Sequence, residues 1–329
     1  MHNRLIRRPG AVRLHLALAF AAAAVAAVPA PAQDDLPLHL FAYDRAAPLE
    51  LQSSPIGQEG EVAIHGISYA SPKGGRVNGR LFVPRGRGPF AGVILAHGAP
   101  GNAEAFTGRA VYIARHGAVV IAIDAPFNRR PGGPTILSPQ DSVEQVQLIV
   151  DLQRAVDVLL ARPDVDSARL AYVGRSYGGA TGAVFAGVER RLTTSILASA
   201  DGGITTRFTA PGAPPPPPGQ EERARAWLAS MQPIEGLRFV GRANGSILFQ
   251  NGRQDQIVPV ARAEALHAAA PAGKEVRWYD APHALNPAAY VDQLRWLSQT
   301  VGTTPPGPED EAGPQIPPPP TPQPQPRQP

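Results

Sequence analysis

Short apolar runs alternate with amphipathic stretches through most of the chain. The apolar runs have the composition of buried strands and lie at 90–96, 118–123, 170–173, 193–198, 246–250 and 275–279. Between them, apolar residues recur three and four positions apart, which predicts helices over 103–116, from Ser138-Pro139 onward, over 259–270 and from Asn286-Pro287 onward. Because strands and helices alternate, this order predicts an α/β fold, with a mostly parallel sheet and helices on both faces.

Two stretches of alternating apolar and polar residues precede the first buried run. Residues 61–69 and 76–83 alternate around a Ser-Pro-Lys-Gly-Gly turn, which predicts an antiparallel N-terminal hairpin at one edge of the sheet. Residues 33–60 have a mixed, proline-containing composition and are expected to form an arm with little regular structure. The pattern therefore places one α/β domain over residues 61–302.

Two segments depart from this pattern. Residues 201–245 separate two predicted strands and contain a run of prolines, so we expect a short insertion over the C-terminal edge of the sheet. Within it, a helix over 220–231 would present Trp227 and Met231. Residues 303–329 are rich in proline and glutamine and carry too little apolar surface to fold, which predicts a disordered tail.

The first 32 residues have the organisation of a secretory signal peptide. Four arginines precede an apolar run at 14–28, and Ala30-Pro31-Ala32 supplies a cleavage site. The alternative is a membrane anchor, for which the run is short. We therefore expect cleavage after residue 32, a mature chain that begins near Gln33, and a periplasmic or secreted protein.

The amino-acid composition excludes several kinds of chemistry and of partner. The 329 residues include no cysteine, which excludes disulfides and thiol catalysis. Lys and Arg total 31 against 27 acidic residues, and four of the arginines lie in the predicted signal peptide, so the mature chain is balanced at 27 against 27. The charge therefore indicates neither a nucleic acid nor an anionic membrane as a partner. The sequence also has no zinc-protease, P-loop or dinucleotide-binding motif, so no metal and no cofactor is expected.

A Gly-x-Ser-x-Gly motif over 174–178 follows the apolar run at 170–173 directly, and a run of small residues typical of a helix comes next. Between a strand and a helix, this motif puts a serine at a tight turn that projects its hydroxyl above the sheet. Gly174 and Gly178 leave room there, because a Cβ at either position would collide with neighbouring backbone. Ser176 is therefore the candidate nucleophile.

A serine nucleophile needs a base, and the base needs an orienting acid. His283 lies in the loop between the last predicted strand and the last helix and is the candidate base. Asp255 follows the run at 246–250 and is the candidate acid, since such sites gather at the carboxyl ends of strands. Asp201 also follows a strand and stays an alternative. Asp280 lies so close to His283 in the chain that a side-by-side pairing is awkward.

An oxyanion hole requires two main-chain N–H groups. Tyr177, the residue after the nucleophile, is the candidate for the first. Ala99, in the loop after the run at 90–96, is the candidate for the second. His97 in the same loop could be a base or a metal ligand, but a structural histidine that holds the loop by hydrogen bonds is the favoured interpretation.

Taken together, His97-Gly98, the motif at 174–179, Asp255 and His283 occur in an order that resembles the α/β-hydrolase superfamily. The resemblance covers about residues 60–302.

Within that superfamily, the chain is similar to the dienelactone-hydrolase and prolyl-oligopeptidase-like esterase branch. This finer resemblance depends on the hairpin that ends in Leu81-Phe82-Val83-Pro84 and on the doubled Gly178-Gly179. The chain departs from prolyl oligopeptidases because too few residues precede the domain for a propeller. It departs from the namesake dienelactone hydrolase because that enzyme uses cysteine as the nucleophile.

These residues imply a serine hydrolase that cleaves a carboxylic ester in a small-molecule ester or acyl substrate. A peptidase or amidase could use the same residues, and a catalytically silent binding protein of the same fold is a further alternative. We expect the pocket to be lined by the insertion and by residues 127–130. Arg129 and Arg130 in that stretch either favour an acidic substrate or are solvated.

Overall fold

The computed structural model describes residues 36–209, 213, 215–216 and 218–314. The predicted signal peptide at 1–32 lies outside these residues, so export of the protein stays a prediction. In the part of the chain that is described, none of the helices combines the length and apolarity that a membrane crossing requires.

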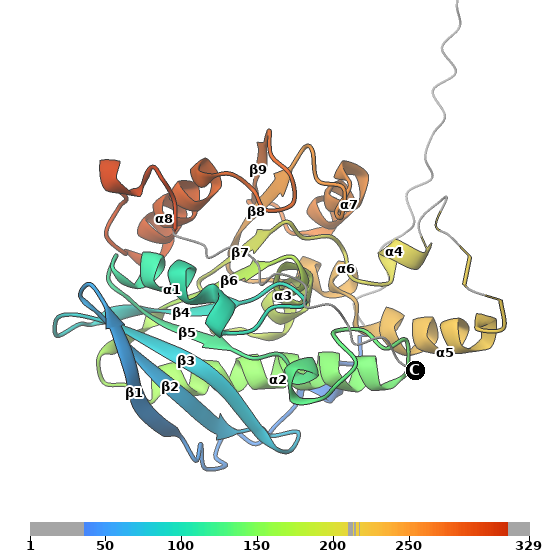
Figure 1. The fold of residues 1–329 in the computed structure, drawn as a ribbon, viewed down its shortest axis with the longest axis horizontal. Coiled ribbons are helices and arrows are strands. Elements are labelled where there is room, and N and C mark those ends of the chain that lie inside the picture. The colour runs from blue at the N-terminus through green and yellow to red at the C-terminus, as the bar shows by residue number, and fades with distance from the viewer. Residues whose placement is uncertain (1–35, 210–212, 214, 217, 315–329) are drawn as a thin grey trace, which may run out of the picture. The chain divides into compact units, whose positions relative to one another are not determined.

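The strands of the described residues form a single nine-stranded sheet in the order β1-β2-β3-β5-β4-β6-β7-β8-β9 (Figure 1). They are β1 (Gln52–Glu59), β2 (Val62–Ala70), β3 (Arg76–Pro84), β4 (Phe90–Ala96), β5 (Ala118–Ile123), β6 (Val165–Arg175), β7 (Thr194–Ala198), β8 (Ser246–Gly252) and β9 (Glu275–Tyr279). Strands β1, β2, β3 and β5 pair antiparallel, whereas β5, β4 and β6 to β9 pair parallel. The predicted fold class, including the antiparallel hairpin β2–β3, is confirmed.

Helices cover both faces of this sheet because its central strands are apolar on both sides. Side chains of β4 alternate between the two cores, with Val93 and Leu95 in one and Ile94 and Ala96 in the other. Helices α1 (Thr107–Ala114) and α8 (Pro287–Val301) cover the first face, and α2 (Gln140–Leu160) and α3 (Tyr177–Val188) cover the second. The remaining helices are α4 (Thr206–Thr209), α5 (Glu221–Met231), α6 (Gly236–Phe239) and α7 (Val260–Ala269), with short 3₁₀ turns at Leu38–Phe41, Glu104–Phe106, Pro126–Arg129, Gln232–Ile234, Val240–Arg242 and Pro308–Asp310.

Local sequence signals define where helix α8 begins and ends. The side chain of Asn286 accepts a hydrogen bond from the N–H of Ala289, and Pro287 occupies the first helical position, where its missing N–H leaves no bond unmade. Gly302 ends the helix with a φ of 65°, in the left-handed region that glycine adopts without strain. The predicted start of this helix is therefore confirmed.

The insertion contains the predicted helix, α5. Trp227 and Met231 of this helix are buried, and the indole N–H of Trp227 donates to Asp141 at 2.8 Å. Because Asp141 lies in the first turn of α2, this hydrogen bond joins α5 to α2.

The N-terminal arm is more regular than predicted. Residues 52–59 form β1, which pairs with β2 at the edge of the sheet, so the expectation of little regular structure is wrong there. Every residue of β1 is exposed, which removes the apolar alternation that usually identifies a strand. Pro55 and Gly57 add a register shift in the pairing, and both residue types are uncommon inside strands.

The beginning of the predicted disordered tail is also packed. Residues 303–314 lie against α1, where Asp310 is fully buried, forms an ion pair with Arg115 and lies 3.2 Å from Nε2 of His116. The hydroxyl of Tyr112 donates to the carbonyl of Asp310 at 3.0 Å. The expectation of disorder is therefore wrong for 303–314, and residues 315–329 lie outside the described residues.

His267 of α7 is a buried histidine whose ring faces aromatic neighbours. Its ring centroid lies 4.6 Å from that of Phe249 and 5.5 Å from that of Trp278, and Nε2 lies 3.0 Å from Oδ1 of Asn251. Burial, with the nearby charge of Lys274, lowers the pKa of His267 from 6.5 to about 4. The ring is therefore neutral at pH 7 and donates from Nε2 to the amide oxygen.

We expect His267 to make the fold sensitive to acid. Between pH 6.5 and about 4 the unfolded chain binds a proton at this position and the folded chain does not, so stability falls as the pH falls through this window. In His267→Gln, the drop in Tm between pH 6.5 and pH 4.5 should be smaller than in the wild type. The exposed His39, replaced by Gln, is the matched control and should leave the drop unchanged. An equal drop in wild type and His267→Gln would contradict this assignment.

Candidate active site

Ser176 occupies the sharp turn between β6 and α3. Its φ of 55° is rare for a residue with a Cβ, and its N–H donates to the carbonyl of Ala198 in the next strand at 2.9 Å. The N–H of Gly178 donates to the carbonyl of His97 at 3.1 Å, which ties this turn to the loop after β4. The turn is thus held from two neighbouring strands, and the motif adopts the strand–turn–helix arrangement that the sequence predicted.

The two glycines of the motif are required by close backbone contacts. A Cβ on Gly174 would overlap the carbonyl of Gly178, and a Cβ on Gly178 would overlap the carbonyl of Ala96. Since both contacts are with backbone, no side chain can move away to relieve them.

We expect Gly178→Ala to destabilise the fold. Overpacking of this kind costs about 3 kcal/mol, and in a domain of this size each kcal/mol lowers Tm by about 2–4 °C, so Tm should fall by roughly 6–12 °C. Gly57→Ala is the control, because a Cβ at Gly57 would meet no atom within 4 Å. Calorimetry that gives both variants the same Tm would contradict the prediction.

The structure brings Ser176, His283 and Asp255 into one hydrogen-bonded line. Nε2 of His283 lies 2.8 Å from Oγ of Ser176, and Nδ1 lies 2.7 Å from Oδ2 of Asp255. A carboxylate accepts only, so Nδ1 carries the proton and Nε2 is left to accept from the serine hydroxyl. This is the geometry that a serine nucleophile with a histidine base requires.

Asp255 is held in place by its own turn. Its side chain is fully buried, and Oδ1 accepts from the N–H groups of Ile257 at 2.8 Å and Val258 at 2.9 Å. These two bonds leave Oδ2 directed at His283, so the carboxylate is oriented before any substrate is bound.

The two alternative acids, Asp201 and Asp280, have other partners. Asp201 is buried, but its carboxylate accepts from the N–H of Gly203 at 3.3 Å and lies 3.6 Å from the guanidinium of Arg262. Asp280 is 85% exposed and lies 3.9 Å from Arg253. Asp255, in contrast, lies 2.7 Å from Nδ1 of His283 through Oδ2.

The candidate oxyanion-hole residues lie on the wall of the same pocket as Ser176. Tyr177 is the first residue of α3, where helical N–H groups have no partner within the helix. Ala99 contributes to the same wall from the loop after β4. Both residues thus line the pocket that contains the nucleophile, and the role of their N–H groups in holding an oxyanion stays a prediction.

His97 is a structural residue, as the sequence favoured. It is buried; Nε2 accepts from the N–H of Ala125 at 3.1 Å, and Nδ1 lies 2.9 Å from the carbonyl of Gly98. Burial lowers the pKa of His97, which agrees with a neutral ring that donates from one nitrogen and accepts at the other. The ring joins the loop after β4 to the loop after β5.

The pocket beside Ser176 has a volume of about 380 Å³, within the range of small-molecule sites. It opens at the carboxyl ends of the parallel strands, because the loops after β4 to β9 supply its walls. Those walls are mostly apolar, with two charged residues, and consist of Ala99, Pro100, Pro134, Thr135, Arg175, Ser176, Tyr177, Ala180, Asp201, Ile204, Ile257 and His283. The insertion thus contributes Asp201 and Ile204, as expected.

Arg129 and Arg130 do not line this pocket, so that expectation is wrong. Arg129 donates to the buried carboxylate of Asp151 at 2.7 Å, and Arg130 contacts both carboxylate oxygens of Glu144, at 2.5 and 2.7 Å. Both arginines are occupied by acids of α2, so neither is directed at a substrate.

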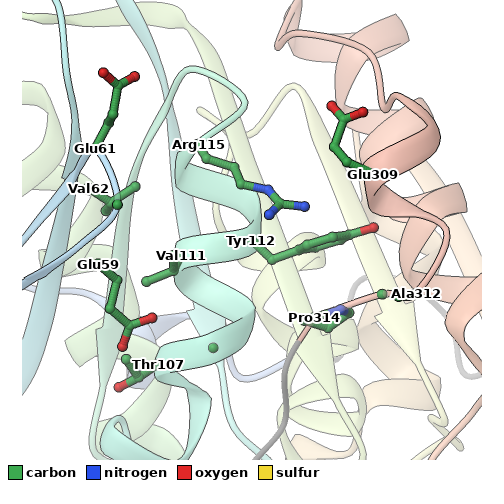
Figure 2. A pocket seen from close by; sticks show the side chains of 13 residues that line it. Glu59, Glu61, Val62, Thr107, Val111, Tyr112, Arg115, Glu309, Ala312 and Pro314 are labelled. Carbon is green, nitrogen blue, oxygen red and sulfur yellow. The ribbon is translucent and has the colours of Figure 1, made fainter.

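A larger cavity, of about 1010 Å³, lies between the β1–β2 turn, α1 and the segment around 309–314 (Figure 2). The carboxylates of Glu59, Glu61 and Glu309 surround it, together with the guanidinium of Arg115. The described residues that line it include no serine and no histidine. Across the described chain, no group of three or more His, Cys, Asp or Glu side chains is placed to hold a metal ion.

Two residues beside the site were missed from the sequence. The hydroxyl of Ser199 donates to the main-chain carbonyl of His283 at 2.8 Å, and Nη2 of Arg175 donates to the same oxygen at 3.1 Å. Arg175 is a variable position of the Gly-x-Ser-x-Gly motif, and Ser199 follows a strand without any motif. Neither carries a signal that would separate it from an ordinary loop residue.

Solved structures with the α/β-hydrolase fold resemble this chain. An acetyl xylan esterase from Paenibacillus sp. R4 aligns with a TM-score of 0.65 and 22% sequence identity, over 80% of this chain and 91% of that one. Acetyl xylan esterase 1 from Thermoanaerobacterium sp. JW/SL YS485 aligns with a TM-score of 0.61 and 18% identity, over 74% of this chain and 86% of that one. The chain therefore has the α/β-hydrolase fold that its motifs predicted.

No protein-family model matches the chain. Acyl-coenzyme A amino acid N-acyltransferase 1 of Mus musculus is 28% identical over 149 residues, and acyl-coenzyme A amino acid N-acyltransferase 2 of the same organism is 28% identical over 134 residues. These matches cover 44% and 40% of this chain, and 32% and 29% of the two relatives. The chain thus matches about a third of the length of these curated relatives.

Proposed function

We propose that this protein is a serine hydrolase that cleaves a carboxylic ester through an acyl-enzyme on Ser176. The observation that carries the proposal is the hydrogen-bonded line from Asp255 through His283 to Ser176, on the wall of a pocket at the carboxyl ends of the strands. The fold shared with two acetyl xylan esterases supports it.

The geometry supports the following role for each residue. Oγ of Ser176 attacks the acyl carbon while its proton passes to Nε2 of His283, and Asp255 stabilises the imidazolium through its bond to Nδ1–H. The N–H groups of Tyr177 and Ala99 hold the oxyanion of the tetrahedral intermediate. His283 then protonates the departing alcohol, and water releases the acyl group by the same steps in reverse.

The pocket favours a small acyl group. Its volume of about 380 Å³ is near the lower end for small-molecule sites, and half of the residues in its wall are Ala, Pro or Ile. An uncharged short-chain ester fits this composition. The names of the two structural neighbours, which specify acetyl esters, agree with a short acyl group.

A second candidate is transfer of the acyl group to an amine instead of water. The similarity to two proteins named as acyl-coenzyme A amino acid N-acyltransferases favours it. Both reactions pass through the same acyl-enzyme and differ only in the nucleophile that resolves it. Amide or peptide cleavage stays an alternative that this geometry does not separate from ester cleavage.

One experiment separates these activities. The protein is incubated with matched acetyl, butyryl and decanoyl esters, thioesters and anilides, each with and without glycine, and free acid and N-acylglycine are measured. We expect the acetyl and butyryl esters to be cleaved fastest, with free acid as the product. N-acylglycine as the main product would indicate the transferase, and fastest cleavage of the anilides would indicate an amidase. If the protein cleaves none of these substrates and does not react with a fluorophosphonate, the hydrolase proposal is wrong.

A further inference from the structure

Strained backbone gathers around the candidate site. Among the described residues, five that are not glycine have a positive φ, and three of them are Ser176, Ser199 and Leu285. Ser176 is the candidate nucleophile, and Leu285 belongs to the loop that contains His283. A left-handed conformation costs a residue with a Cβ about 1–3 kcal/mol and persists only where surrounding contacts enforce it. Ser199 is not explained by the proposed chemistry, so its contacts require an explanation.

Ser199 joins three parts of the site. It follows β7, is fully buried, and has a φ of 50°. Its N–H donates to the carbonyl of Gln250 in β8, the strand that leads to Asp255, at 2.7 Å. Its hydroxyl donates to the carbonyl of His283 at 2.8 Å. The left-handed turn therefore directs the hydroxyl at the backbone of the candidate base.

The carbonyl of His283 and the carbonyl that follows it are both held. Nη2 of Arg175 is a second donor to the His283 carbonyl, at 3.1 Å. The hydroxyl of Tyr290 donates to the carbonyl of Ala284 at 2.9 Å and accepts from Arg109 at 2.9 Å. Because the backbone around His283 is held at two consecutive carbonyls, the imidazole can move only by rotation about its two side-chain torsions. The bonds to Ser176 and Asp255 then fix those torsions.

We propose that Ser199 is a positioning residue, which sets the distance from His283 to Ser176 and Asp255 through its hydrogen bond to the His283 carbonyl. Arg175 supports the same carbonyl through its guanidinium. This inference rests on the proposed function for its kinetic consequence. Its structural part, the placement of the imidazole, can be measured without turnover.

Ser199→Gly isolates the hydroxyl. Glycine adopts a positive φ without strain, so the variant keeps the turn and the N–H bond to Gln250 while losing the bond to His283. A displacement of about 1 Å at a reacting group can lower the rate about 100-fold, so we expect kcat to fall roughly 10- to 100-fold, with KM within about twofold of wild type. In proton NMR, the low-field signal of the His283 Nδ1–H should shift or broaden.

Ser199→Ala removes the same hydroxyl but keeps the strain. It should lower kcat as much as Ser199→Gly does, while its Tm is lower than that of the glycine variant. Ser195→Ala is the matched control, because Ser195 is a buried serine of the preceding strand β7 and should leave kcat and the NMR signal unchanged.

Each outcome is decisive. A kcat within twofold of wild type in Ser199→Gly, with an unchanged Nδ1–H signal, would overturn the positioning role. The positioning role would also be overturned if the variant with the lower Tm showed the larger loss of kcat. A residue that only stabilises the fold predicts this correlation between kcat and Tm. If the wild type cleaves no acyl substrate, the proposed function fails, yet the NMR signal still tests the placement of His283.

Discussion

Ser176→Ala should abolish turnover without unfolding the protein. Alanine removes the nucleophilic hydroxyl. The turn between β6 and α3 keeps the hydrogen bond from the N–H of residue 176 to the carbonyl of Ala198. Loss of the nucleophile in such an arrangement lowers kcat by roughly 10⁴–10⁶. Initial rates on a short-chain aryl ester would measure the loss, and labelling by a fluorophosphonate should disappear with it.

A surface serine provides the control for this experiment. Ser142 is partly exposed on α2 and does not line the pocket beside Ser176, so Ser142→Ala should keep both full activity and labelling. Circular dichroism and Tm should match the wild type in both variants. Activity of Ser176→Ala within tenfold of wild type on a good ester would remove Ser176 from the mechanism.

Asp255→Asn should lower kcat by about 10³–10⁴ with the fold intact. The amide oxygen can still accept from the N–H groups of Ile257 and Val258, which leaves the NH₂ group facing Nδ1 of His283. An NH₂ group donates, so the imidazole must move its proton to Nε2, where it can no longer accept from Ser176. The rate is lost through the wrong tautomer of the histidine.

Asp201→Asn is the matched comparison, because Asp201 is also a buried aspartate on a loop after a strand. It lines the pocket, so a modest change in KM is expected, but its effect on kcat should be far smaller. Rates on one ester at neutral pH give the ranking. If Asp201→Asn proves the more damaging of the two, the acid has been assigned to the wrong residue.

Most of the fold and the arrangement of the site were readable in the sequence. Strands β4 and β5 are unbroken apolar runs because both of their faces are buried, and this pattern is visible without coordinates. Ser176, Asp255 and His283 each follow a strand. Since parallel strands end at one edge of the sheet, the order of elements alone predicts that the three side chains meet.

What the sequence did not reveal depends on contacts between distant residues. Proline content predicted disorder from residue 303 onward, yet Asp310 is buried because Arg115 and His116 surround its carboxylate. The position of Arg130 after a strand predicted a pocket residue, whereas its side chain pairs with Glu144 of α2. The role of Ser199 depends on a backbone angle, which no residue type specifies.

The two edge strands of the sheet affect whether the protein aggregates at high concentration. An edge strand offers unpaired N–H and C=O groups on which a strand of another molecule can add, and extended flat edges promote aggregation. At one end, β1 carries Pro55, which has no N–H to donate, and its pairing with β2 shifts register between Pro55 and Gly57. At the other end, β9 is only five residues long. Both edges are therefore poor templates for strand addition, which protects the sheet from growing into intermolecular assemblies.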